Sequence, residues 1–283
     1  MTVTTEQLTT LASAHFPADF AAAWSALIKP AISLKPAAAG DPVIGKLGGV
    51  PALGSHPWPV WDGHGPLGHV LSIDCQTANQ LLPHLNLPAA GHLAFFYFDG
   101  RFNNDYGTVG FWDPTSAAGQ RVVHVTDGQG APAIVPDGLP VFAEIDLTGV
   151  VIATPPSYNH PVLGDAWRSV APENMEAFET AIRELMHPLG ARHQLGGQAH
   201  PIQDAVEFEI AEAIGRLTDP DTFTRDADSY RILSKDVQLL AQVDSDHAAQ
   251  MMWGDMGILY WARPSREVQS HSVATTGFTW QCS

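Results

Sequence analysis

The chain has 283 residues, 45% of them hydrophobic, and its 30 acidic and 14 basic side chains give a formal net charge of −16. Because no cluster of Lys and Arg is available to neutralise phosphates, we do not expect the chain to bind nucleic acid. An acidic membrane surface would repel it, and no apolar run is long enough to span a bilayer. The acidity favours dispersal in water and also suits a basic partner.

The N-terminus and the cysteine content predict a cytoplasmic protein. Residues 1–10 are polar and contain no basic side chain, so they do not form a secretory signal. Cys75 and Cys282 are the two cysteines, too few for a disulfide framework in a chain of this size.

Residues 1–45 predict a helical N-terminal segment. Thr4 and Gln7 have the spacing of a capping box at the start of the first helix. A second apolar stripe at helical spacing runs from Phe20 to Ile28, and Pro30 ends it.

Residues 46–155 predict a first unit of short strands. Runs of aromatic and β-branched residues are separated by Gly, Asn, Asp and Pro. Because no helical pattern separates these runs, neighbouring strands should pair antiparallel. Strands are expected at residues 92–98, 108–112, 120–126 and 141–147.

Residues 156–283 predict a second unit, in one globular body with the first. A proline-rich connector at residues 155–172 precedes two helices whose apolar stripes begin at Met175 and Val206. An acidic loop follows the second helix. Strands are then expected at residues 236–243, 257–262 and 270–282.

One pattern occurs twice in the same order. Leu-Gly-Gly begins at Leu47 and again at Leu195, and each copy is followed by a strand that ends in Asp, at Asp74 and Asp244. Gly-x-Leu with aromatic residues comes next in both places. Paired glycines suit a turn with positive φ, and the aromatic strand supplies buried area. The predicted fold class is α+β, with two repeated units of mainly antiparallel strands and flanking helices.

The segments around this pattern resemble the YwqG-like family of bacterial proteins. They are KLGGVP (46–51), WP (58–59), GHLAFF (91–96), HQLGG (193–197), LLAQVDSD (239–246), MWGDMGILYW (252–261) and FTWQC (278–282). Ser72 departs from the family, whose first strand tends to carry Gln, as Gln242 does in the second half. The resemblance implies a duplicated α+β fold, no established activity, and an immunity-type binding role through the toxin systems near some members.

Motifs for common catalytic chemistries are incomplete. Residues 40–46 have the glycine spacing and the lysine of a phosphate-binding loop, but Leu47 replaces the required Ser or Thr. Residues 63–68 spell a dinucleotide-binding pattern outside its strand–helix setting. Cys75 lacks a nucleophile signature, and we expect it to be buried in a strand. Asp244, Asp246 and His247, with Asp255 nearby, either contribute to a cation site or form ordinary turns, and we expect no metal and no cofactor.

These observations favour a non-enzymatic binding or interaction protein with a protein or small-molecule partner and a site in the groove between the two units. The alternative is a hydrolase that uses a carboxylate cluster, with or without a divalent metal. The second half concentrates amides, carboxylates and an aromatic surface, although the amides could instead close backbone hydrogen bonds. The candidate binding residues are Gln203, Gln242, Asp244, Trp253 and Asp255.

Overall fold

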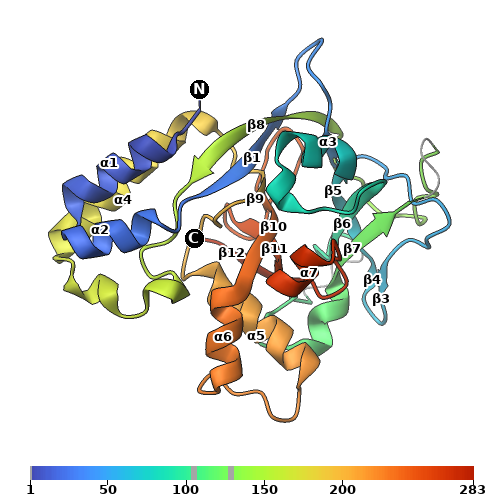
Figure 1. Ribbon diagram of the computed structural model, residues 1–283. Coiled ribbons are helices and arrows are strands. Elements are labelled where there is room, and N and C mark those ends of the chain that lie inside the picture. Colours follow the sequence, from blue (N-terminus) through green and yellow to red (C-terminus); the bar gives the residue numbers. More distant parts are fainter. Residues whose placement is uncertain (1, 103–106, 127–130) are drawn as a thin grey trace.

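The centre of the computed structural model, which describes residues 2–102, 107–126 and 131–283, is one curved antiparallel sheet of ten strands (Figure 1). From one edge to the other the strands are β12 (Gly277–Gln281), β11 (Ile258–Pro264), β10 (Val237–Asp244), β9 (Gln194–Gly196), β1 (Lys29–Pro36), β8 (Ile145–Thr154), β2 (Gly45–Leu47), β5 (Gly68–Asp74), β6 (His92–Tyr97) and β7 (Gln120–Val125). A separate pair, β3 (Val60–Trp61) and β4 (Gly65–Pro66), lies outside it.

The two ends of this sheet turn towards each other, and aromatic side chains fill the space between them. Phe95 of β6 lies 5.3 Å from Trp261 of β11 between ring centroids, and Tyr97 lies 5.3 Å from Phe278 of β12. Trp253 packs edge-on against Tyr97 at 5.6 Å. All five side chains belong to one buried cluster. The space in which we expected a binding groove is therefore packed core.

Most helices pack against the sheet in two groups, while the short helices α3 (Cys75–Leu81) and α7 (Ser265–Gln269) lie against β5, β6 and β8 and against β10 and β11 respectively. On the left of Figure 1, α1 (Thr5–His15), α2 (Ala18–Ser25) and α4 (Pro172–Met186) pack through Phe16, Trp24 and Phe178. This group shares a core with residues of β1 and β8. At the bottom, α5 (Val206–Thr218) and α6 (Asp228–Asp236) cover β10 and β11. The apolar stripes predicted from the sequence are thus buried, that of α5 against β10 and β11 and that of α4 against the aromatic side chains of α1 and α2.

Several predicted elements are confirmed. The capping box is present, since Thr4 Oγ1 accepts from the Gln7 backbone N–H at 3.3 Å and the Thr4 N–H donates to Gln7 Oε1 at 2.9 Å. The mixed helix and strand composition and the antiparallel pairing also agree with the prediction. Strands are found close to the expected positions at β6, β7, β10, β11 and β12.

Other elements differ from the expectation. The N-terminal segment contains a strand, β1, and the acidic loop contains part of a helix, α6. Cys75 is buried at the start of a helix, α3 (Cys75–Leu81), rather than in a strand, because the Asp74 carboxylate caps it by accepting from the Thr77 N–H at 2.7 Å. Residues 108–112 form no strand.

The two Leu-Gly-Gly segments have closely similar backbones. Residues 48–49 have φ values of 55° and 64°, and residues 196–197 have values of 65° and 73°. In each segment the side chain before Leu donates to a carbonyl four residues further on, from Lys46 at 3.1 Å and from Gln194 at 2.8 Å. The positive φ inferred from the paired glycines is therefore present in both places.

We predict that Gly48→Ala destabilises the protein much more than Gly63→Ala. Both glycines have a positive φ, +55° and +84°, but an added Cβ would lie 2.3 Å from the Ala143 carbonyl oxygen at Gly48 and would meet nothing within 4 Å at Gly63. The left-handed conformation alone costs an L-residue about 1–2 kcal/mol, and overpacking adds about 1–3 kcal/mol. Urea unfolding measures the difference. Equal losses would show that the Ala143 carbonyl moves aside freely.

Candidate functional site

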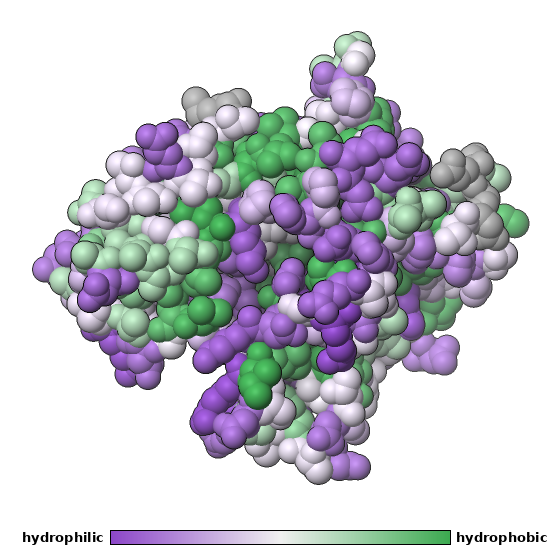
Figure 2. All heavy atoms as spheres, viewed as in Figure 1, coloured by the Kyte–Doolittle hydropathy of each residue, from purple (hydrophilic) through white to green (hydrophobic). Residues whose placement is uncertain are grey.

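A cavity of about 560 Å³ lies between α4, the connector that follows β8, and residues 192–203. Tyr158 of the connector, Phe178 of α4, and Arg192 and Gln203 on the opposite wall contribute to its lining. In Figure 2 the outline of the molecule is notched between the helices on the left and those at the bottom. The cavity thus separates the helical layer from the second half of the sheet.

Amide side chains from the sheet hold the wall formed by residues 192–203. Gln242 of β10 is fully buried; its Oε1 accepts from the His200 N–H at 3.0 Å and its Nε2 donates to the Arg192 carbonyl at 2.8 Å. Gln281 of β12 accepts from the N–H groups of Ile202 and Gln203 at 2.8 Å and 3.1 Å. An irregular segment cannot pair its own backbone groups as a strand does, so these amides fix its path.

The guanidinium of Arg192 is incompletely paired. Its Nη1 is buried and has no hydrogen-bond partner among the described residues. Burial lowers the pKa of Arg192, and the neighbouring Asp244 acts in the opposite direction. The Asp244 carboxylate accepts from the Arg192 backbone N–H at 2.9 Å. Ser157 Oγ, on the same cavity, is a second buried polar atom without a partner. Two residues that line the cavity thus each carry a buried polar atom without a hydrogen-bond partner.

The charged side chains that line the cavity are Arg183, Arg192 and Glu179, and Asp244 lies beside Arg192. Arg183 of α4 also lines the cavity, is exposed, and lowers the pKa of Arg192 by like-charge repulsion. Burial, with help from Arg192, lowers the pKa of His200 to about 3, so its ring is neutral at pH 7. A neutral imidazole both donates and accepts hydrogen bonds. The two arginines therefore supply the positive charge.

The family model named DUF1963, a domain of unknown function, matches residues 45–282. The chain belongs to this family. A comparison with curated proteins finds no match. Within the described parts of the DUF1963 chain, no helix has the length and apolarity needed to cross a membrane.

The structure places the five predicted site residues of this DUF1963 protein in different surroundings. Gln203 lines the cavity, where its Nε2 donates to the Cys282 carbonyl at 3.0 Å. Gln242 and Asp244 lie behind the wall and bind its backbone. Trp253 is buried between the two ends of the sheet, and Asp255 is exposed.

Two of the carboxylates considered for metal binding, those of Asp244 and Asp246, already have protein partners. Asp246 is paired with His193 at 3.2 Å, and this hydrogen bond lowers the pKa of Asp246 to about 2. Asp244 accepts from a backbone N–H, as described above. Across residues 2–102, 107–126 and 131–283, no three His, Cys, Asp or Glu side chains converge as metal ligands.

Sequence reasoning missed Arg192, Arg183, Ser157 and Tyr158. The connector and α4 were read only as structural elements, and nothing in their patterns shows that they face residues 192–203. One signal was present: Arg192 lies just before the second Leu-Gly-Gly segment, where the first half of this DUF1963 protein has an apolar residue, Ile44.

Gln242→Ala should lower the free energy of unfolding by about 1–3 kcal/mol, because it leaves the His200 N–H and the Arg192 carbonyl without their buried partner. Gln203→Ala is the control, since that side chain is exposed and the expected loss is within about 0.5 kcal/mol. Urea unfolding compares the two. Unchanged stability in Gln242→Ala would contradict its role in supporting the wall.

Acid should destabilise the protein through its buried histidines. Burial lowers the pKa values of His69 and His160 to about 4 and that of His200 to about 3. The unfolded chain takes up protons near pH 6.5, so the stabilising contribution of each histidine is present above this pH. This contribution is lost as the pH falls towards the pKa that the histidine has in the folded protein, by on the order of 3 kcal/mol per histidine.

The matched comparison for this pH effect is His69→Gln against His187→Gln, because His187 is exposed. Unfolding free energies measured from pH 7 to pH 4 should fall less steeply in His69→Gln than in the native protein, whatever its stability at pH 7. His187→Gln should keep the native slope. Identical slopes in all three proteins would show that His69 does not contribute to the destabilisation by acid.

Proposed function

We propose that this DUF1963 protein is a non-enzymatic binding protein whose ligand places an anionic group in the cavity beside Arg192. The observation that carries the proposal is the buried Arg192 Nη1 without a partner. Leaving a buried donor unpaired costs about 1–3 kcal/mol, more for a charged group. A carboxylate or phosphate oxygen would remove that penalty by accepting a charge-assisted hydrogen bond.

The other donors around the cavity support an anionic ligand. Ser157 Oγ has no partner, and Arg183 reaches the same space from α4. Arg192 Nη1 is closed off from water, while the side chain as a whole borders the cavity. The rigid wall behind it limits the entropy that binding costs, which favours affinity.

Binding is better supported than catalysis. The amide side chains in the wall are committed to backbone groups, and Asp244, proposed for the hydrolase alternative, accepts a backbone hydrogen bond. Ligand recognition requires only the arginines and the neighbouring donors, which are already at the cavity. We also propose a cytoplasmic location, from the N-terminus and the cysteine content. An immunity-type role and a place among the YwqG-like proteins are proposed from the family resemblance.

Internal duplication is part of the same proposal. In the β2–β5 pair Lys46 lies opposite Ser72, and in the β9–β10 pair Gln194 lies opposite Gln242. The strands β5 and β10 each contain a register shift, after His69 and after Leu239. The strand order is also the same when it is read outwards from the β1–β8 pair. We infer two repeated units, the first opening with β1 and the second with β8, which moves their starts from residues 46 and 156 to residues 29 and 145.

Arg192→Met should abolish anion binding without weakening the fold. Methionine keeps much of the apolar volume and removes a buried guanidinium nitrogen that lacks a hydrogen-bond partner, so stability should be unchanged or higher by about 1 kcal/mol. Calorimetric titration with acetate, succinate and inorganic phosphate provides the measurement. Arg231→Met is the control, since Arg231 is exposed and pairs with Asp228 at 3.4 Å. The proposal is wrong if none of the anions binds the native protein, or if Arg192→Met binds them equally well.

A further inference from the structure

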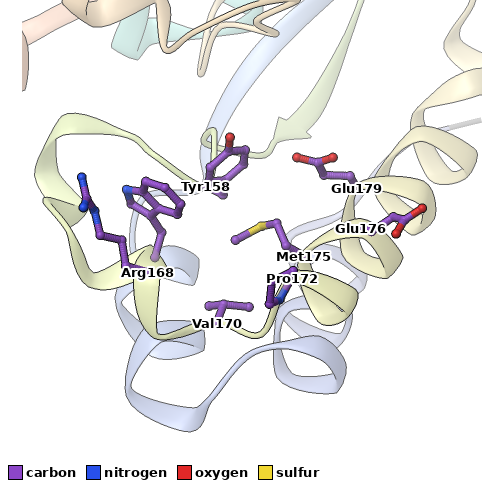
Figure 3. Close-up of a pocket in the computed structure, with 8 residues that line it drawn as sticks. Tyr158, Arg168, Val170, Pro172, Met175, Glu176 and Glu179 are labelled. Atoms are coloured by element: carbon purple, nitrogen blue, oxygen red, sulfur yellow. The ribbon is translucent and has the colours of Figure 1, made fainter.

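A second pocket, of about 430 Å³, adjoins the cavity and shares Tyr158 and Glu179 with it. It lies between residues 158–170 and the first turns of α4 (Figure 3). Val170 and Pro172 lie at one side, and Met175 extends into its middle. Tyr158 and Glu179 therefore border both spaces.

Two aromatic rings form one side of this pocket. The rings of Tyr158 and Trp167 meet edge to face, 5.5 Å apart between centroids. The guanidinium carbon of Arg168 lies 5.4 Å from the centroid of the Trp167 ring, while Figure 3 shows the Arg168 side chain extending away from the pocket. The faces of Tyr and Trp attract cations, most strongly where water is partly excluded. The ring pair is therefore suited to an ammonium group.

A carboxylate lies across from these rings. In Figure 3 the side chain of Glu179 extends towards Tyr158, whereas that of Glu176 points away from the pocket. Burial and the charge of Glu179 both raise the pKa of Tyr158. Glu179 and Arg183 are one helical turn apart on α4, with Glu179 at the wall of both spaces and Arg183 lining only the cavity. The charges along this face of α4 thus run from negative to positive.

We infer that the ligand is a zwitterion, whose ammonium group occupies the Tyr158–Trp167 pocket while its carboxylate or phosphate group reaches Arg192. This inference rests on the proposed function, because it requires the anion site. The order of charges matches such a molecule: the aromatic rings and Glu179 face the cation, and Arg183 and Arg192 face the anion. Linking two weak groups in one molecule makes the second contact intramolecular and raises affinity.

Calorimetric titration of the full chain tests the inference with three kinds of probe. They are acetate, tetramethylammonium, and trimethylammonio carboxylates of increasing chain length. One chain length should bind at least about tenfold more tightly than acetate or tetramethylammonium, since it alone spans both sites. If every zwitterion binds no better than acetate, the inference fails while the proposed anion site stands. If neither acetate nor the zwitterions bind, both fail.

Variants separate the two sites. Glu179→Gln keeps the shape of the side chain and should weaken binding of the best zwitterion about five- to tenfold while acetate binding stays native. Glu176→Gln is the matched control three residues earlier on the same helix, and it should bind every probe as the native protein does. Trp167→Leu should weaken binding of the zwitterion by a similar factor to Glu179→Gln. Equal effects of Glu179→Gln and Glu176→Gln would overturn the cation site.

Discussion

The pairing of β1 with β8 is the constraint on which the rest of the structure depends. The two strands run antiparallel over eight residue pairs, from Lys29 opposite Thr154 to Pro36 opposite Leu147. On its other side β1 pairs with β9, and β8 pairs with β2. Each arm of the sheet therefore begins on a strand that is distant from it in the chain. The same pair carries the helical layer of α1, α2 and α4, and so sets one side of the cavity.

The elements that could be predicted from sequence are those whose signal is local. Amphipathic spacing identified α4 and α5, and aromatic runs identified β6 and β11. β1 was missed because its few buried residues follow a helical stripe and a proline, and its strand character comes from partners more than 110 positions away. α6 was missed because its segment is polar, and α3 because an Asp at a strand end suits a turn as well as a helix cap.

The candidate site was only partly accessible from sequence for a related reason. The abundance of amides in the second half was recognised, but an amide that holds a wall and one that holds a ligand have the same chemistry. What distinguishes them is the partner, and the partners of Gln242 are backbone groups at Arg192 and His200. The cavity itself arises where three segments meet, and no single segment contains its pattern.

Ile44 and Arg192 occupy similar positions in the two halves of the chain but differ in chemistry. Each lies two residues before a β-paired position, Lys46 opposite Ser72 and Gln194 opposite Gln242. Ile44 is fully buried in the main core, so an apolar side chain suffices there to complete the fold. Arg192 instead carries a buried nitrogen without a partner, which costs stability. The proposed anionic ligand would remove that cost by pairing the nitrogen.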